Sequence, residues 1–565
     1  MDRSLRPLLI PTLLALLLGA AAAAQDEPGG RTPASLFVDR VDVNVVNVEV
    51  FVTDKKGRRV SGLTADDFEV LENGQPMEIT NFYAVERGRP VAGPGVETIP
   101  EAEPPGRPAT VAEAAVPPEQ RLHLIVYIDN FNLRPENRNR VLHRTHRFLR
   151  TKLGPEDRVM VVSFDRSLHV RQPFTSDMDL VIDALTELED LSGSRTIRDA
   201  ERRKVLEEID DANDELTAMQ DARFFAESIY TEMDFVLDAL ANHVSALSGL
   251  TGRKALLYVS DGLPKVPGED IFLYVEERFP RAKARIEAFA YDLGPRIREL
   301  VSQANAGGIT FYTLEAGGLQ AHSSVSAEYG GTKSGGGLAF IDSLRNANLT
   351  EPLYMLADDT GGKAIVNTNA VEAELSGVAE DFDNYYSLGY QAPHQGDGRY
   401  YKIEVKLKRK GLQVRHRRGY RDKTAEARLT DGSIAALYFG FETNPLGADL
   451  VFGDTSRREG KFLLPMTIKI PLGKLALAPQ EGNYLGRVTV SVVVMDEEGK
   501  VSPVHQQEPL VISIPESDIE RAREQYFSYD LGLSVKQGVV RIAVGVRDEI
   551  GAEISFLRQT VRVTA

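Results

Sequence analysis

The sequence predicts an α/β plus all-β fold: a doubly wound, mostly parallel sheet inserted in a β-sandwich unit and followed by an immunoglobulin-like β-sandwich. Residues 120–384 alternate short apolar runs with helical stretches, which is typical of a parallel sheet covered on both faces. Residues 36–85 and 385–424 alternate apolar and polar side chains, as half-buried strands do. Residues 430–565 contain only strand patterns separated by acidic and glycine turns, which indicates a sandwich.

The N-terminus has the order of a secretory signal peptide. Arg3 and Arg6 precede an apolar stretch that ends in a run of small residues up to Ala24. We predict a signal peptide over residues 1–24 and a linker over 25–35. A membrane anchor is the alternative, but the apolar stretch is short for a bilayer span. No later segment is apolar enough to span a membrane, so we expect an exported mature chain, periplasmic or secreted, without a membrane span.

Composition limits the classes of partner. The net charge of −17 argues against nucleic acid and against an anionic membrane surface. The chain has no cysteine, which excludes disulfides, thiolate metal sites and cysteine catalysis. With 565 residues it is long enough for several hydrophobic cores. We therefore expect a protein partner, in the cell envelope or outside the cell, and no nucleic acid.

Two β segments flank the α/β region. The N-terminal β unit, residues 36–85, ends at a linker over 86–119 that is rich in proline, glycine, alanine and glutamate. The β hairpin at 385–424 follows the α/β region directly. We therefore predict that the two segments pair into one sandwich into which the α/β domain is inserted. This arrangement requires contacts between residues 41–52 and 401–420.

The central stretch of the α/β region is RLHLIVYIDNFNL. Its apolar run, residues 124–128, reads as a buried parallel strand and ends in Asp129, with Asn130 and Asn132 beyond it. A second buried strand, ALLYVS, ends in Asp261. Ligands of open α/β sheets bind at the carboxyl ends of the strands, so these side chains mark the candidate site.

Two helical insertions interrupt the α/β pattern. Residues 198–250 carry apolar side chains at steps of three and four, which predicts one long helix or a helical pair. This helix either caps its own domain or projects as an arm for a partner. Residues 263–306 hold more helix, broken at Pro280 and Pro295. The glycine-rich stretch at 321–339 lacks the spacing of a phosphate loop.

Several segments together resemble the von Willebrand factor A-type domain, and within it the acidobacterial VWFA-related group of exported proteins. The segments that carry the resemblance are VDVNVVNVEVFVTDKKGRRVSGLTADDFEVLENGQ, LIVYIDNFNL, FDRSLHVRQPFTSD, RKALLYVSDGLP, ANAGGITFYTL, LADDTGGKAIVNTN and YYSLGYQ with KIEVKLKRKGLQVRHRRGY. The resemblance covers most of the chain up to about residue 421. It implies a von Willebrand factor A-like domain over residues 120–384.

The resemblance also implies a metal-ion-dependent adhesion site for Mg²⁺ or Mn²⁺. The family's Asp-x-Ser-x-Ser turn, later Thr and last Asp are matched by Asp129, Thr196 and Asp261, with Thr175 as a second candidate for the Thr. Cations of this class need oxygen ligands in near-octahedral geometry, with one position left for a partner's carboxylate.

The sequence departs from that pattern in the turn itself. Phe131 and Leu133 occupy the two serine positions, and neither side chain can ligate a cation. Asn130 and Asn132 stand at the alternate positions, which makes them candidates for a binding surface. We therefore expect a degenerate metal site and no cofactor. The rival interpretation of the two aspartates is structural, as caps of helices and hydrogen-bond acceptors at strand ends.

The favoured function is a non-enzymatic, exported, adhesion-type scaffold that binds protein through the top face or the helical insertion of the A-like domain. The alternatives are a Mg²⁺-dependent adhesion module and a structural spacer of a cell-envelope assembly. A hydrolase with Asp129 and Asp261 as its carboxylate pair lacks a nucleophile and a ligand set. His143 and His146 lie at helical spacing without a third ligand in the segment, so they are expected on a solvated face.

Overall fold

The computed structural model describes residues 45–86, 88–91, 121–319, 338–440, 442–458 and 461–564. The predicted signal peptide, the linker at 25–35, most of the linker at 86–119 and most of the glycine-rich stretch lie outside the described residues. Among the described helices, none combines the length and the apolarity that a bilayer span requires.

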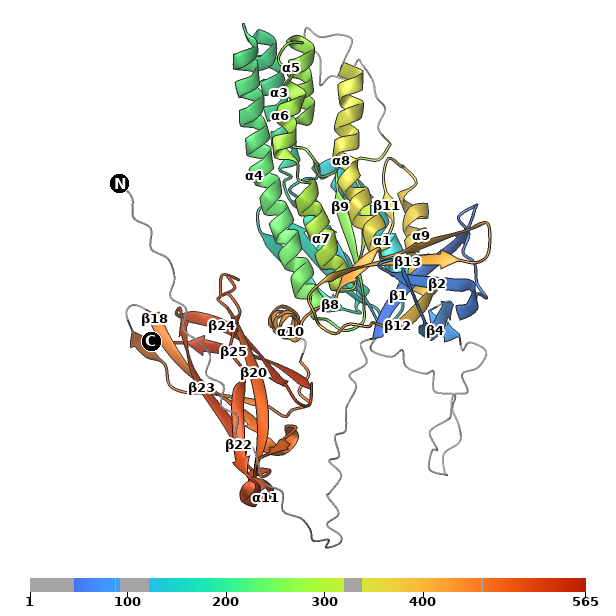
Figure 1. The fold of residues 1–565 in the computed structure, drawn as a ribbon. Coiled ribbons are helices and arrows are strands. Elements are labelled where there is room, and N and C mark those ends of the chain that lie inside the picture. The colour runs from blue at the N-terminus through green and yellow to red at the C-terminus, as the bar shows by residue number, and fades with distance from the viewer. Residues whose placement is uncertain are drawn as a thin grey trace, which may run out of the picture. The chain divides into compact units, whose positions relative to one another are not determined.

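The N-terminal β unit and the later hairpin segment form two facing sheets (Figure 1). One sheet has the order β14-β1-β12-β4-β5 and the other β15-β13-β2-β3. Apolar side chains from both sheets, among them Val48, Val70 and Val405, form one core. The strands are β1 (Val45–Asp54), β2 (Phe68–Glu72), β3 (Gln75–Met77), β4 (Ile79–Glu86), β5 (Arg89–Val91), β12 (Tyr385–Gln391), β13 (Tyr400–Leu407), β14 (Leu412–His416) and β15 (Gly419–Arg421).

The contacts that the insertion prediction requires are present. Val50 of β1 pairs with His416 of β14, and Val70 of β2 pairs with Val405 of β13. The predicted hairpin segment is therefore divided, because β12 and β14 join one sheet of the sandwich and β13 and β15 join the other. The intervening chain, from β6 to α9, forms the α/β domain between strands of one sandwich.

The α/β domain contains a six-stranded sheet in the order β11-β10-β9-β6-β7-β8, parallel except for the edge strand β8. Apart from β8, its strands are nearly continuous apolar runs because both faces are covered. The order reverses between β6 and β9, which is the topological switch point of a doubly wound sheet. The strands are β6 (Leu122–Ile128), β7 (Arg158–Phe164), β8 (Leu168–Thr175), β9 (Arg253–Ser260), β10 (Ile309–Glu315) and β11 (Ala364–Ile365).

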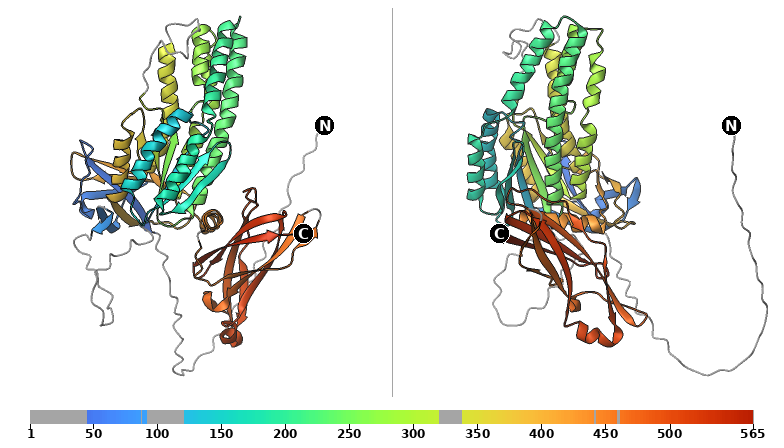
Figure 2. Two further views of the ribbon diagram at one scale, coloured as in Figure 1. Left: turned by 180° about the vertical axis from the view of Figure 1, so that it is seen from behind. Right: turned by 90° about the vertical axis from the view of Figure 1, so that its left-hand side faces the viewer.

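Helices cover each face of this sheet (Figure 2). Helices α1 (Pro135–Lys152), α2 (Met178–Glu187) and α9 (Val371–Asp383) contribute to the core on one face, beside the short turn η3 (Leu188–Asp190). On the other face the core includes side chains of α4 (Glu215–Ser248), α7 (Gly294–Ala306) and α8 (Leu338–Thr360).

The first helical insertion is a pair of helices: α3 (Arg195–Asp211) and the N-terminal half of α4. Only the C-terminal half of α4 covers the sheet. The other half packs with α3, α5 (Glu269–Arg278) and α6 (Ala284–Ala288) around a separate small core, which we call the helical layer. Figure 1 shows this layer continuing past the carboxyl ends of the strands, so the insertion both covers its own domain and extends beyond it.

The C-terminal region is a sandwich of two antiparallel sheets around one core. The prediction that residues 430–565 contain only strands is wrong for residues 430–439, which belong to the helix α10 (Ala425–Phe439). Thr424 caps this helix, and its small and apolar side chains pack on β20 and β24. A second, short helix is α11 (Ile519–Ala522). The strands are β16 (Asp449–Phe452), β17 (Ser456–Arg458), β18 (Lys461–Pro471), β19 (Ala478–Gln480), β20 (Asn483–Met495), β21 (His505–Gln506), β22 (Leu510–Pro515), β23 (Tyr526–Val535), β24 (Gly538–Asp548) and β25 (Ile554–Val563).

Candidate functional site

The candidate site lies at the switch point of the α/β sheet. Strands β6 and β9 are parallel neighbours, and Asp129 and Asp261 directly follow their carboxyl ends. The Asp129 N–H donates to the Val259 carbonyl, and the Asp261 N–H donates to the Asn132 carbonyl. The sheet therefore brings together the two aspartates that the sequence analysis selected.

The Asp129 carboxylate is buried and directed inward. It accepts hydrogen bonds from the Asn132 backbone N–H at 3.2 Å and from the Asn132 Nδ2 at 2.7 Å. It also accepts from the Tyr258 hydroxyl and from the Ser260 Oγ at 3.3 Å. Burial raises the pKa of Asp129 above its usual value, against the lowering effect of these donors. Both carboxylate oxygens are thus used within the fold.

The Asp261 carboxylate acts as a helix cap. Its Oδ2 accepts from the Arg134 backbone N–H at 2.8 Å, and the Asn137 Nδ2 donates to both of its oxygens at 3.0 and 3.1 Å. Helix α1 begins at Pro135, and Arg134 provides no capping acceptor of its own. An acceptor at this position satisfies a free backbone N–H at the start of the helix. The negative charge of the carboxylate also interacts favourably with the positive end of the helix dipole. These contacts agree with the structural interpretation of Asp261.

The two residues at the serine positions belong to the hydrophobic cores. Phe131 is 6% exposed and packs on one face of the sheet, while Leu133 is fully buried on the other. The ring of Phe131 also lies beneath the guanidinium of Arg198, 4.6 Å from its centroid. The turn therefore directs apolar side chains, rather than oxygen ligands, to both sides of the strand.

The two asparagines of the turn lie below the surface. Asn130 is 1% exposed and Asn132 is 0% exposed, which does not agree with their selection as binding-surface candidates. Asn130 donates to the Ser192 carbonyl and accepts from Arg138, so it joins α1 to the segment before α3. The reason for the burial is that the turn folds back over Asp129 and becomes part of the core.

Neither candidate threonine joins the aspartates through a described contact. Thr196 lies in the first turn of α3 with an exposed side chain. Thr175 pairs with Val159 near the start of β7. It therefore lies at the amino ends of the parallel strands, whereas Asp129 lies at their carboxyl ends. The position at which a later Thr ligand was expected is instead occupied by arginines of α3.

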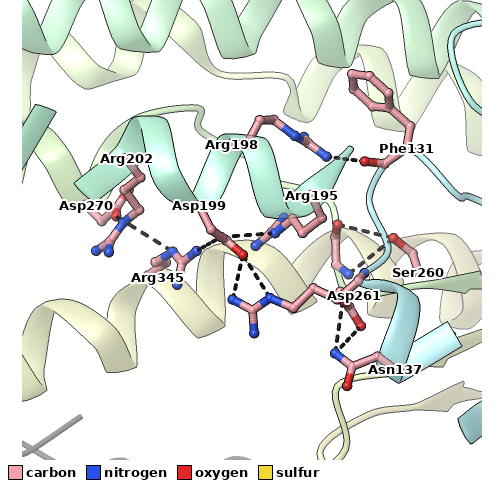
Figure 3. A network of polar contacts seen from close by, with 12 residues as sticks. Phe131, Asn137, Arg195, Arg198, Asp199, Arg202, Ser260, Asp261, Asp270 and Arg345 are labelled. Carbon is pink, nitrogen blue, oxygen red and sulfur yellow. Dashed lines mark hydrogen bonds and ion pairs between the residues drawn. The ribbon is translucent and has the colours of Figure 1, made fainter. Parts of the chain in front are cut away.

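The arginines and aspartates of α3, α5 and α8 form a partly buried ionic network (Figure 3). Asp199 lies 2.8 Å from the Arg134 Nε, 3.2 Å from the Arg345 Nη2 and 3.5 Å from the Arg195 Nε. Burial raises the pKa of Asp199, but these guanidiniums outweigh it and hold the pKa below its usual value. The carboxylate is therefore ionised at neutral pH.

Asp270 extends the network to the second helical insertion. It accepts from the Arg202 Nε at 2.6 Å and lies 3.8 Å from the Arg345 Nε. Arg198 completes the link to the turn, because its Nη2 donates to the Phe131 carbonyl. A cavity of about 50 Å³, lined by Arg195, Arg202 and neighbouring side chains, adjoins the network.

The residues at the switch point do not fit a divalent cation of the adhesion-site type. The carboxylate oxygens of both aspartates already accept hydrogen bonds, the two serine positions are apolar, and the guanidinium of Arg198 lies beside the turn. A hard cation would have to displace several of these donors and would meet guanidiniums of its own sign. The arrangement holds the carboxylates with internal donors and arginines.

The sequence analysis missed the arginine–aspartate network. Arg195, Arg198, Asp199 and Arg202 recur at the i, i+3, i+4 and i+7 spacing of one helix face, which was the available signal. A charged helix face is usually solvated, so the pattern alone does not indicate burial.

Comparison with solved structures finds similarities with low TM-scores. No family model and no curated protein matches the chain. A von Willebrand factor type A protein from Catenulispora acidiphila has 8% identity and a TM-score of 0.20, covering 79% of this chain and 66% of that one. The pilus adhesin SpaC from Lactobacillus rhamnosus GG has 9% identity and a TM-score of 0.24, covering 79% and 52%.

An aerotolerance-related membrane protein from Bacteroides fragilis has 13% identity and a TM-score of 0.23, covering 46% of this chain and 98% of that one. These TM-scores are too low to carry an argument about fold or function. The assignment of a doubly wound sheet therefore rests on the strand order of the chain itself.

Proposed function

We propose that this chain is an exported, non-enzymatic scaffold of the von Willebrand factor A type that binds a protein partner through its helical insertion, without a metal at the switch point. The observation that carries the proposal is the number of exposed apolar side chains on the helical insertions and the start of α8. The closed switch point supports the absence of a metal, because its carboxylates already accept hydrogen bonds inside the fold.

Helix α4 provides the main part of this surface. Phe224 is 63% exposed and Phe235 is 67% exposed, and their spacing corresponds to about three helical turns, so both lie on one side of the helix. Most described large apolar side chains that are more than half exposed belong to the helical insertions and the start of α8: Ile197, Leu216, Phe224, Phe235, Ile286, Phe289 and Phe340. A contiguous patch of exposed apolar side chains on a soluble protein marks an interaction site, and the proposal takes these side chains to form one.

An ion pair holds two parts of this surface together. Arg223 Nε and Nη2 donate to the Glu287 carboxylate at 2.5 and 2.7 Å, which joins α4 to α6 next to Phe224 and Ile286. A fixed pair of helices presents its apolar side chains at a lower entropic cost on binding than a mobile arm would. This geometry favours a protein partner with a complementary apolar face.

A hydrolytic function has little support from the candidate carboxylates. Asp129 is fully buried and Asp261 caps α1, so neither carboxylate is open to a substrate in this arrangement. General acid–base catalysis requires a group within hydrogen-bond reach of the reacting atoms. This is why the proposal is non-enzymatic.

A crosslinking pull-down from the native organism's envelope fraction tests the proposal. The full chain is compared with the variant Phe224→Ser/Phe235→Ser and with the matched control Val511→Ser/Tyr526→Ser, whose side chains are similarly exposed in the C-terminal sandwich. We expect the helix variant to lose a captured protein that the wild type and the control retain.

Two outcomes contradict the proposal. Capture that is unchanged in the helix variant would place the interaction elsewhere. Capture that EDTA abolishes and Mg²⁺ restores would favour the metal-dependent adhesion module. Equal melting temperatures of both variants and the wild type exclude misfolding, because exposed side chains contribute little to stability.

A further inference from the structure

We propose that His143, His146 and Glu189 form a Zn²⁺ site with three protein ligands and one open coordination position. The cluster lies where α1 meets the short turn η3, separate from the aspartates of the switch point. The sequence analysis placed both histidines on a solvated face for lack of a third ligand. Folding supplies that ligand from Glu189.

The ligand atoms are close to the separations that zinc requires. One atom from each of the three side chains lies within 4.8 Å of the other two, and His143 Nδ1 is 3.5 Å from Glu189 Oε1. Zinc bonds of about 2.0–2.2 Å in tetrahedral geometry place ligand atoms about 3.3–3.6 Å apart. The histidines are three residues apart on α1 and therefore share one side of the helix.

Two polar atoms of the cluster have no hydrogen-bond partner within the described part of the chain. Among the described residues, neither His146 Nε2 nor Glu189 Oε1 has a hydrogen-bond partner, although both atoms are shielded from solvent. A buried acceptor that lacks a donor costs free energy, which a bound cation would recover.

The backbone around the carboxylate is anchored. The Glu189 carbonyl accepts from Arg138 Nη2 at 2.9 Å and from Asn139 Nδ2 at 3.0 Å. Arg138 is itself fully buried and donates to Asn130, so η3 is attached to the turn that follows β6. Such outer contacts orient metal ligands and reduce the entropy that is lost on binding.

The donor set selects the class of metal and its coordination. Two imidazoles and one carboxylate suit zinc and its neighbours, whereas Mg²⁺ and Ca²⁺ prefer sites built from oxygen alone. Structural zinc sites are closed by four protein ligands, and sites with three keep one position for water or another molecule. The His143 side chain is 79% exposed, so the cluster is accessible from solvent on that side.

Calorimetric titration of the full chain with Zn²⁺ tests the proposal. Since the loss of an outer contact costs about 10–100-fold in metal affinity, His146→Ala and Glu189→Gln should each lower the Zn²⁺ affinity by about 100-fold or more. His505→Ala is the matched control, because His505 is exposed on β21 and should not affect the titration. With Co²⁺ as the probe, the wild type should show the visible absorption of a tetrahedral site and the His146 variant should not.

The proposal is overturned if His146→Ala and the wild type bind Zn²⁺ equally. It is also overturned if His394→Gln removes the binding, because His394, Asp397 and Asp422 form another described cluster of possible ligands. Should the half-buried His146 variant fail to fold, His143→Gln replaces it, since an exposed side chain can be exchanged without harm to the core.

Discussion

Replacing Asp199 by asparagine is expected to destabilise the helical layer, because three guanidiniums then lose a shared carboxylate. Asp199 is 8% exposed and lies within 3.5 Å of Arg134, Arg195 and Arg345. Breaking a buried ion pair on one side costs about 3–5 kcal/mol. Arg134 is about one-third exposed and Arg345 keeps Asp270, so we expect the lower end of that range, about 3 kcal/mol.

Hydrogen exchange of the α3 amides measures this loss directly, since a protein with several cores has no single unfolding equilibrium. A destabilisation of about 3 kcal/mol corresponds to roughly 100-fold faster exchange. The folded pKa of Asp199 is lowered, so its contribution is complete above about pH 3.8 and disappears as the pH falls through the folded value. The difference from the wild type should therefore be full at pH 7.

Glu207→Gln, at an exposed position of the same helix, is the matched control and should leave exchange unchanged. An Asp199→Asn variant whose α3 amides exchange within twofold of the wild type would refute the network as a source of stability. Such a result would mean that water enters and screens the guanidiniums.

Two further predictions concern metal and pH. Millimolar Mg²⁺ or Mn²⁺ should leave the melting temperature unchanged, and Asp129→Ala should lower it equally with and without metal; a metal-dependent rise in the wild type would count against this. Burial lowers the pKa of His243 to about 4, so stability should fall as the pH drops from 6.5 to 4, by up to about 3 kcal/mol. His243→Phe should flatten that decline in acid unfolding curves, and an unchanged slope would contradict it.

Features that depend on consecutive residues, such as a buried strand, could be predicted from the sequence. The apolar run before Asp129 indicated a strand buried on both faces, and its carboxyl end indicated where a ligand would bind. The sequence also showed that the two hydroxyl ligands are absent, because Phe131 and Leu133 occupy the serine positions. The pairing of β1 with β14 also followed from the order of segments along the chain.

Charged side chains that meet from distant segments were not predictable. Arg134, Asp199 and Arg345 come from three separate elements, and a charged helix face looks the same in sequence whether it is solvated or covered. Glu189 likewise joins His143 and His146 only because η3 folds against α1. Residues 430–439 form a helix because packing on β20 and β24 selects it over the strand pattern of the region.

The sequence by itself determined the central strand, the position of Asp129 and the loss of the serine ligands, because apolar periodicity and residue type are local properties. Only the tertiary structure decided what replaced those ligands. An unpaired buried charge is costly, and the arginines that pair with Asp199 and Asp270 come from segments that the chain brings together only when it folds. At the end of the central strand Asp129 remains, and Asn132, Tyr258 and Ser260 donate hydrogen bonds to it.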